Sequence, residues 1–401
     1  MLQPRKLLFL GAGIFHVPAI LRARELGYHV ITLDYLPKNI GHRYSNQSIN
    51  CSTTDVDGVL HAAIENGIDG IFTFASDIAL PSVAHVAQQL GLPGVSPGIV
   101  RVLTQKHRFR EFQKEALGSD FVCAGAGTWE ECESIIVSMN KRLVIKPVDS
   151  SGSKGIAFVD SGDLSHAQAA FKEAMTFSRE GSVCLEEYID GDDVTAEGFV
   201  EDGRVSLMAV SRKFRNGFAV YGHYLDRSLK NIDYERIANL LSSHFQAIEY
   251  DHGPFDADLR ISRERAVVLE MSPRLGGNGI ALAAGVYLGV DLLDKAIRQA
   301  MGETFSMPSS RLSNKPCGSF VLGSVREGRV AGYASVDQIR AAVEGIAEIY
   351  LDLELGKQVH SFVHGGHAFG YCIFETESEG DFHTKANEIT RALALKVEND
   401  G

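Results

Sequence analysis

Hydrophobic and polar positions in the first hundred residues alternate between two patterns. Short apolar runs such as KLLFL and HVITL are typical of buried strands, and the segments between them carry apolar residues at helical spacing. Strand and helix therefore alternate, which predicts βαβ units forming a parallel sheet with helices on both faces. The pattern predicts strands, with their closing turns, at 6–13, 29–35, 68–77 and 92–95, and helices at 16–27, 56–67 and 79–91.

The pattern changes after residue 103. TQKHRFREFQKEALG (104–118) predicts a basic helix, and the apolar runs LVIKP and GIAFV then flank a loop of serines and glycines. Because both flanks are strands and no helix follows the loop, the segment predicts a hairpin flap rather than a P-loop, which opens a helix. Backbone N–H groups of such a flap can cover phosphates, and Lys146 before it adds a positive charge. A flexible hairpin with a surface lysine is the alternative.

Two acidic segments follow the flap. CLEEYIDGDD (184–193) predicts a strand and a turn that could offer backbone groups and Glu186 to a purine and Asp193 to a ribose; a solvated acidic hairpin is the alternative. FDADLRISRERAVVLEMSPR then places Asp258 and Glu270 near the ends of two strands joined by a polar turn. Antiparallel pairing would bring both carboxylates to one end of the sheet, where they suit Mg²⁺. Arg274 follows closely and can face the same charge.

The first strand–helix turn carries a partial dinucleotide-binding pattern. Gly11 and Gly13 are followed by IFH, so the third glycine is absent, although Asp34 stands where a ribose-binding acid would lie. A helix N-terminus at this turn can still attract a substrate anion. Ser76 and Asp77 end another strand at the same sheet edge, where they either face that crevice or cap the next helix.

Two further motifs leave their role open. SRKFRNGFAVYGHYL (211–225) contains Arg212, Lys213 and Arg215, which either bind an acid substrate or belong to a mobile basic loop. HGGH (364–367) suggests a metal, but without a third ligand it is more typical of a turn.

Composition excludes several classes of protein. The 401 residues suggest two or three domains, and 45% hydrophobic with 22% charged residues is ordinary globular usage. The net charge of −12 argues against a nucleic-acid or anionic-membrane partner. There is no apolar run long enough to span a bilayer, and the start becomes glycine-rich too soon for a signal peptide, so we expect a cytoplasmic protein. The six cysteines have no CxxC pair and are expected to be reduced.

The order of the motifs IKP…SGSKG, LEEYIDGDD and DADLR…LEMSPRLGG resembles the ATP-grasp superfamily over residues 104 to about 300. The first part of the chain resembles the preceding domain of carbamoyl-phosphate synthetase, biotin carboxylase and the purine-pathway carboxylate–amine ligases. FGYCIFETESEGDFHTKANEITRAL resembles their small C-terminal domain. The resemblance implies a mixed α/β and α+β fold: a Rossmann-like domain at 1–103, a two-lobed ATP-grasp domain at 104–301 with its small lobe at about 120–190, and a C-terminal α+β region at 302–401 packed on the central lobe.

The resemblance also implies roles for individual residues. Asp258 and Glu270 would bind Mg²⁺, for which Mn²⁺ can substitute, and Arg274 with Lys146 would stabilise the transferred phosphoryl group. Ser272 stands where the family often has asparagine, so the second metal site would be weaker. Arg274 is also a candidate for substrate contact. From their positions in the chain, Gly11, Gly13, Ser76, Asp77 and Arg212 are further candidates. The ATP-binding residues would be Lys106, Lys146, Ser151, Gly152, Ser153, Lys154, Gly155, Glu186, Glu187, Tyr188, Ile189 and Asp193.

Three functions follow from this sequence. The first is an ATP-dependent ligase that activates a small-molecule carboxylate as an acyl-phosphate and couples it to an amine, releasing ADP and phosphate. The second is bicarbonate activation through carboxyphosphate, although no biotin carrier segment or glutaminase-like cysteine–histidine arrangement is apparent. The third is a non-catalytic nucleotide-binding protein or an NAD-dependent oxidoreductase. Related enzymes are often dimers and nothing in the chain contradicts a homodimer, but the sequence does not fix the oligomeric state.

Overall fold

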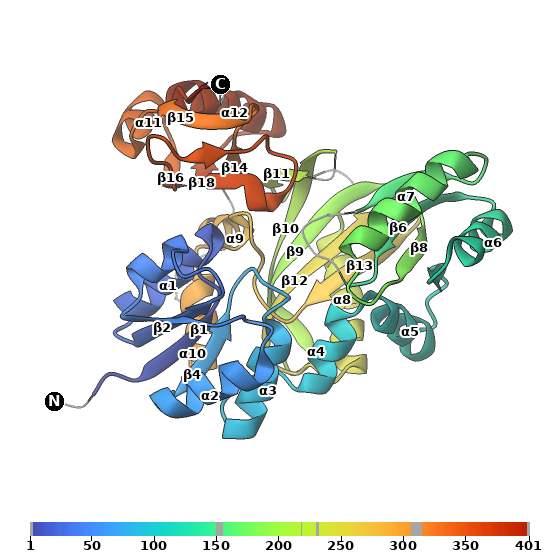
Figure 1. Ribbon diagram of the computed structural model, residues 1–401, viewed down its shortest axis with the longest axis horizontal. Helices are drawn as coiled ribbons and strands as arrows, with labels where there is room; N and C mark the ends of the chain where they lie inside the picture. The colour runs from blue at the N-terminus through green and yellow to red at the C-terminus, as the bar shows by residue number, and fades with distance from the viewer. Residues whose placement is uncertain (1–2, 150–154, 218, 230–231, 306–314, 399–401) are drawn as a thin grey trace.

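The computed structural model describes residues 3–149, 155–217, 219–229, 232–305 and 315–398. A four-stranded parallel sheet, here the first sheet, has the order β3-β2-β1-β4 and occupies the blue part of Figure 1. Its strands are β1 (Lys6–Leu10), β2 (His29–Asp34), β3 (Gln47–Asn50) and β4 (Gly70–Thr73). The helices of this part are η1 (Ile14–His16), α1 (Val17–Glu25), η2 (Ile40–Tyr44), α2 (Val56–Asn66), α3 (Leu80–Leu90) and α4 (Pro97–Thr104).

The predicted parallel sheet is confirmed, with two corrections. Residues 92–95 form no strand, because α3 ends at Gly91 in the left-handed region and Ser96 already caps α4. The strand β3 was not predicted, since QSIN contains a single apolar residue and shows no strand pattern.

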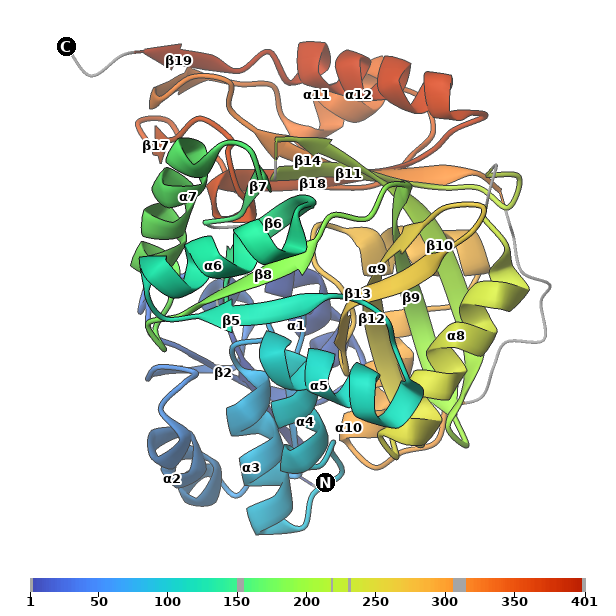
Figure 2. The same ribbon diagram turned by 90° about the vertical axis from the view of Figure 1, so that its right-hand side faces the viewer.

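A second, antiparallel sheet of four strands, here the small-lobe sheet, has the order β5-β8-β6-β7. It contains β5 (Cys123–Ala126), β6 (Arg142–Pro147), β7 (Ala157–Asp160) and β8 (Val183–Glu187). The predicted hairpin around the serine–glycine loop is the β6–β7 pair, with Ile145 opposite Ala157. The helices α6 (Trp129–Met139) and α7 (Leu164–Phe177) pack on this sheet (Figure 2). The basic helix α5 (Lys106–Leu117) precedes it and is separated from α4 by Gln105, whose backbone is extended.

The third, large sheet is antiparallel throughout and has the order β13-β12-β9-β10-β11-β14-β18-β16. Its strands are β9 (Asp192–Glu201), β10 (Arg204–Asn216), β11 (Ala219–Leu225), β12 (Gly253–Ile261), β13 (Ala266–Ser272), β14 (Cys317–Gly323), β16 (Ile346–Leu351) and β18 (Ala368–Glu375). The sheet therefore continues from the central part of the chain into its C-terminal hundred residues. A small sheet, β17-β15-β19, lies beyond it, formed by β15 (Gly328–Gly332), β17 (Gln358–Val359) and β19 (Lys396–Glu398).

One helix joins the first sheet to the large sheet. α9 (Ile280–Leu288), with sequence IALAAGVYL, is apolar on every side and therefore suits a fully buried position. Its buried residues share one core with Phe9 of the first sheet and Ile373 of the large sheet, and Figure 1 shows it between the two. The other helices of this half are α8 (Tyr234–Ala247), α10 (Leu292–Ala300), α11 (Val336–Ala342), η3 (Gly365–His367) and α12 (Glu379–Leu393). In the described ranges, every helix is too short or too polar to cross a membrane.

We predict that Phe382→Ala lowers the free energy of unfolding by about 3–5 kcal/mol, because this side chain attaches α12 to the large sheet. Phe382 is fully buried and its ring lies 4.9 Å from that of Phe214 and 5.3 Å from that of Phe374. A Cβ at Gly222 or Gly318 would overlap the same ring, so both glycines leave room for it.

Urea unfolding measures the change, with Phe177→Ala as the matched control. Phe177 is 42% exposed, so its truncation should change stability by about 0.5 kcal/mol or less. Equal losses in the two variants would contradict the assigned role of Phe382.

Candidate active site

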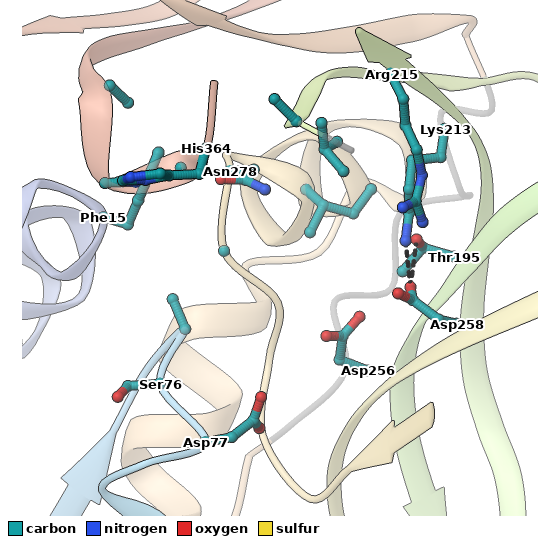
Figure 3. A pocket seen from close by; sticks show the side chains of 18 of the residues that line it. Phe15, Ser76, Asp77, Thr195, Lys213, Arg215, Asp256, Asp258, Asn278 and His364 are labelled. Carbon is teal, nitrogen blue, oxygen red and sulfur yellow. Dashed lines mark hydrogen bonds and ion pairs between the residues drawn. The ribbon is translucent and has the colours of Figure 1, made fainter. Parts of the chain in front are cut away.

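A cavity of about 770 Å³ is lined by residues of the first sheet, the small-lobe sheet and the large sheet, and Figure 3 shows some of these residues. Each part contributes to its lining: the turns after β1 and β4, the inner face of the small-lobe sheet, the polar face of β9–β13, and the loop before β18. The predicted site residues that line it are Gly13, Ser76, Asp77, Lys106, Lys146, Glu186, Glu187, Tyr188, Ile189, Lys213, Arg215, Asp258, Glu270, Ser272 and Arg274.

Asp258 and Glu270 face each other across the β12–β13 pair, as antiparallel pairing predicted. The Asp258 Oδ1 atom is 2.5 Å from Lys213 Nζ and accepts a hydrogen bond from Thr195 Oγ1 at 2.9 Å. Burial opposes ionisation, but Lys213 and Arg215 outweigh it and lower the pKa of Asp258 to about 2. Glu270 Oε1 lies 3.8 Å from Lys106 Nζ. Both carboxylates are thus placed beside cations at one wall of the cavity.

This donor set fits a divalent cation such as Mg²⁺. Carboxylate oxygens are the hard ligands that Mg²⁺ prefers, and nucleotide phosphates commonly complete its coordination. Asp258 is ionised at neutral pH and has a lysine as its present counter-ion. A metal ion bound by Asp258 would therefore replace Lys213 as the positive partner of this carboxylate.

Arg274 connects the first sheet to the large sheet. Asp77 accepts from its Nε at 2.9 Å and from its Nη2 at 2.6 Å, and Asp256 accepts from its Nη1 at 2.5 Å. Ser272 Oγ donates to Asp77 as well, at 2.5 Å. Burial would raise the pKa of Asp77, but Arg274 and Ser272 lower it below the usual range. Asp77 is therefore a partner of Arg274, while α3 begins only at Leu80.

A buried acid pair lies beneath Arg274. Glu197 is opposite Asp256 in the β9–β12 register and is fully buried. Its Oε1 accepts from the Gly276 N–H at 2.7 Å, and its Oε2 has no hydrogen-bond partner among the described residues if both acids are ionised. Burial first, and the neighbouring carboxylate second, raise the pKa of Glu197 well above its ordinary value; burial raises that of Asp256 to about 6. Burial and mutual repulsion therefore oppose the ionisation of both carboxyl groups at once. Sequence reasoning missed this acid pair, although Asp256 is two residues from Asp258 and so on the same strand face.

Two residues with a strained backbone line the cavity. Ala75 (φ 58°) and Asn278 (φ 55°) both occupy the left-handed region, which non-glycine residues rarely adopt. Both line the cavity, and a Cβ on Gly277 would be 3.1 Å from that of Ala75. Strain of this kind concentrates at functional sites, where the surrounding structure holds it.

On the opposite wall, Glu186 holds Lys146. Lys146 Nζ is 2.5 Å from Glu186 Oε2, and Arg110 Nε donates to Glu186 Oε1 at 2.8 Å. Burial alone would raise the pKa of Glu186, but Arg110 and Lys146 lower it to about 2. The predicted purine-binding carboxylate thus positions the predicted phosphate-binding lysine. Arg110 was not singled out in the sequence, because a basic residue in a basic helix carries no special signal.

Three more of the predicted residues take part in other ion pairs. The Asp193 Oδ2 atom lies 2.5 Å from Arg215 Nε, and Glu187 Oε1 lies 2.9 Å from Arg265 Nη1. Arg212 is not brought to the cavity: it pairs with Asp192 and Glu379, because successive strand residues point to opposite faces and Lys213 takes the cavity side.

The predicted flap at 150–155 is described only from Gly155, whereas the predicted purine-binding segment at 184–193 is described in full. Tyr188 and Ile189 line the cavity, and the Arg142 guanidinium lies 4.6 Å from the centroid of the Tyr188 ring. Gly155 has a φ of 66°. Ser151, Gly152, Ser153 and Lys154 lie outside the described residues.

Side chains of the chain itself support the turn after β1. Asp34 Oδ2 accepts from the Ala12 N–H at 2.8 Å, so this acid supports the turn. Gly11 has a φ of 100° and the ring of His16 lies where its Cβ would be, which requires glycine. Gly13 lines the cavity and its N–H donates to His16 Nδ1 at 3.0 Å, whereas the lining residues do not include Gly11.

The HGGH motif forms η3 and lines the end of the cavity near Phe15 and Asn278 (Figure 3). His364 Nδ1 accepts from the Gly366 N–H at 3.1 Å, which makes the motif a turn, one of the two interpretations left open. The ring centroids of His364 and His367 are 3.7 Å apart. The loop thus brings the imidazole of His364 to an end of the cavity away from Asp258 (Figure 3).

Comparison with known proteins agrees with this geometry. Residues 139–281 match the family model of the ATP-grasp domain. The chain is 23% identical over 322 residues to the protein y4rH of Sinorhizobium fredii, covering 77% of this chain and 64%, slightly under two thirds, of that relative. It is 23% identical over 359 residues to the formate-dependent phosphoribosylglycinamide formyltransferase of Herminiimonas arsenicoxydans, covering 82% of each protein.

Solved structures share the fold over nearly the whole chain. Phosphoribosylglycinamide synthetase from Anaerococcus prevotii superposes with a TM-score of 0.78 at 17% identity, covering 99% of this chain and 100% of that one. L-amino acid ligase from Bacillus licheniformis superposes with a TM-score of 0.78 at 18% identity, and the match covers 100% of both chains. The biotin carboxylase domain of Hydrogenobacter thermophilus 2-oxoglutarate carboxylase, solved with MgADP and bicarbonate, gives 0.74 at 16% identity, covering 98% and 90%.

The chain therefore has the ATP-grasp fold and contains an ATP-grasp domain. The predicted resemblance to ATP-grasp enzymes and the predicted fold class are confirmed.

The ion pairs of Glu186 predict a pH dependence of stability. Because the folded state lowers its pKa to about 2, below the unfolded value of about 4.3, the pairs stabilise the fold above pH 4.3. This contribution is lost as the pH falls from about 4.3 through about 2. Glu186→Gln should lower the free energy of unfolding by about 3–5 kcal/mol at pH 7, since it leaves Arg110 and Lys146 without their carboxylate.

Urea unfolding between pH 7 and pH 3 measures the difference in the free energy of unfolding between Glu186→Gln and the wild type. This difference should narrow below about pH 4.3. Glu173→Gln, at an exposed position of α7, is the matched control and should track the wild type. A gap that stays constant across this range would contradict the ionised pair.

Proposed function

We propose that this chain is an ATP-dependent carboxylate–amine ligase. It activates a small-molecule carboxylate as an acyl-phosphate, couples the acyl group to an amine, and releases ADP and phosphate. The observation that carries the proposal is the placement of Asp258 and Glu270 opposite each other in the same cavity as Lys106, Lys146 and Arg274. Two carboxylates for a metal and three cations for phosphates are the charges that phosphoryl transfer requires.

The nucleotide would lie between the small-lobe sheet and the large sheet. Lys106 and Lys146 would contact its phosphates, the 150–155 loop would cover them, and residues 186–189 would hold the adenine. Asp193 would reach the ribose after release from Arg215. Asp258 and Glu270, with Ser272 nearby, would hold Mg²⁺, which when bound neutralises phosphate charge. Lys213 would leave Asp258 at that point and become available to an anion.

Phosphoryl transfer needs positioning and charge balance more than a protein nucleophile. The substrate carboxylate would attack the γ-phosphorus in line, while Arg274 faces the transferred group from its fixed position between Asp77 and Asp256. The amine would then attack the acyl carbon, and the phosphate would leave as its C–O bond breaks. Exclusion of water by the flap would protect the acyl-phosphate from hydrolysis.

The substrates would occupy the part of the cavity beyond Arg274. Phe15, Asn278 and His364 form that end, which combines an aromatic surface with hydrogen-bonding groups (Figure 3). Such a lining suits small polar molecules. The similar proteins include a phosphoribosylglycinamide synthetase and an L-amino acid ligase, which supports an amino acid or a related small acid as the carboxylate.

The direct test is ADP release from MgATP with a panel of amino acids, dipeptides, hydroxy acids and bicarbonate, each with and without ammonia or a second amino acid. ADP formed only when one acid and one amine are both present supports the ligase and identifies its substrates. ADP formed with bicarbonate alone would favour carboxyphosphate chemistry. NAD binding with no ATP turnover across the panel would overturn the proposal.

We predict that Glu270→Ala abolishes ligase turnover and leaves the fold intact, since it removes a metal ligand from a partly exposed position. Steady-state ADP release and a thermal melt measure the two effects. A variant that keeps more than about a tenth of the wild-type rate would contradict the metal assignment, because loss of one charge-balancing group costs at least about tenfold.

Lys146→Ala should raise the KM for ATP by about tenfold or more, because it removes a cation from the phosphate site. The matched control is Lys141→Ala in the same small lobe, whose side chain pairs with Glu187 and is 57% exposed. The control should keep the wild-type KM. An unchanged KM in Lys146→Ala would mean that this lysine does not contact ATP.

A further inference from the structure

Two cysteine thiols are in contact beside residues 186–189, the proposed adenine-binding segment. The Cys123 Sγ on β5 is 3.1 Å from the Cys184 Sγ on β8. In the strand register, Cys123 is opposite Glu186 and Cys184 is opposite Gly125, so the cysteines are diagonal neighbours. This pair was not predicted from the sequence, because 61 positions separate its members.

The distance between the sulfurs favours a disulfide over a metal. Cys123, Cys184 and Glu186 bring their ligand atoms within 4.8 Å of one another, which is close enough for a metal ion. Zinc, however, binds thiolates at about 2.3 Å and in tetrahedral geometry holds two of them about 3.8 Å apart. The observed separation is shorter, and the third ligand, Glu186, is already bound by Lys146 and Arg110. Two cations beside the group oppose a further cation.

The two thiols differ in exposure and in ionisation. Cys123 is partly exposed, whereas Cys184 is buried. The hydrogen bond with Cys184 lowers the pKa of Cys123, assisted by Arg110 and Lys146, and the same contact together with burial raises the pKa of Cys184. Cys123 is therefore the thiol that an oxidant reaches first, and Cys184 is placed to resolve the product.

We propose that Cys123 and Cys184 form a reversible disulfide that weakens nucleotide binding. The Cys123 thiolate attacks a small-molecule disulfide such as oxidised glutathione, forming a mixed disulfide and releasing one thiolate. Cys184 then loses its proton to solvent and attacks the Cys123 sulfur, and the second small thiolate leaves. The protein thiols lose two electrons in total, and the small disulfide gains them.

The effect on the nucleotide rests on the proposed function, through Lys146. Cys184 is the direct cross-strand neighbour of Lys146 in the β6–β8 pair, and its Sγ lies 3.8 Å from Glu186 Oε1. Bond formation shortens the sulfur–sulfur distance to about 2.05 Å, which draws Cys184 toward β5. The Glu186 carboxylate, which holds Lys146, lies on the same face of β8 as Cys184 and moves with it. Lys146 therefore loses its position toward the phosphates.

The test uses the full chain, fully reduced or equilibrated with oxidised glutathione. Peptide mapping without reductant detects the cross-link, and calorimetry measures the Kd of MgATP in both states without any ligase substrate. We expect a Cys123–Cys184 cross-link that dithiothreitol reverses and a Kd at least about fivefold higher in the oxidised chain. Cys123→Ser and Cys184→Ser should keep the reduced-state Kd under oxidant. Cys51→Ser, which removes the other partly exposed cysteine, should respond like the wild type.

Absence of the cross-link, stable zinc binding by the pair in place of it, or a cross-link with unchanged Kd would each overturn the inference. A reduced chain that fails to bind MgATP would instead contradict the proposed function and with it the regulatory role, while the peptide map still reports on the disulfide. The two failures are therefore distinguishable.

Discussion

The ion pair between Arg274 and Asp77 is the constraint on which the rest of the site depends. Arg274 is only 11% exposed, and a buried guanidinium without carboxylate partners would be strongly destabilising. Its partners come from the end of the first sheet and from β12, so the two sheets must meet at this point. The close approach of Gly277 to Ala75 and the strained backbone of Ala75 and Asn278 are consequences of that meeting. The cavity is the space left beside this contact.

The same principle extends around the cavity, because its cations are matched with carboxylates: Lys213 with Asp258, Lys146 with Glu186, and Arg215 with Asp193. A free nucleotide brings only negative charge, which the carboxylates oppose. A metal–nucleotide complex brings both signs, so it can exchange partners with these pairs at little electrostatic cost. Charged groups fixed in this way are preorganised for phosphoryl transfer. Under the proposed function, the cavity would therefore bind the metal complex of a nucleotide better than the nucleotide itself.

Much of this architecture is predictable from the chain. Apolar periodicity predicts the parallel sheet, and the twelve-residue interval between Asp258 and Glu270 places them opposite each other once the turn between their strands is identified. The ion-pair partners were not predictable, because they come from distant segments: nothing near Glu186 in the sequence indicates Arg110, and nothing near Arg274 indicates Asp77. Successive side chains of a strand point to opposite faces, so the sequence alone predicts that only one of Arg212 and Lys213 faces the cavity. The structure shows that it is Lys213. The Glu197–Asp256 pair was not predictable either, because the register between β9 and β12 is known only from the fold.

The most direct test of the account is calorimetric titration of the wild-type chain with ATP, with and without Mg²⁺. The account predicts binding of MgATP, and an affinity for ATP alone that is at least about tenfold weaker, since the carboxylate wall repels an unpaired triphosphate. Mn²⁺ should substitute for Mg²⁺. Equal affinity with and without the metal, or no binding of MgATP at all, would contradict the central claim that these paired charges form a metal–nucleotide site.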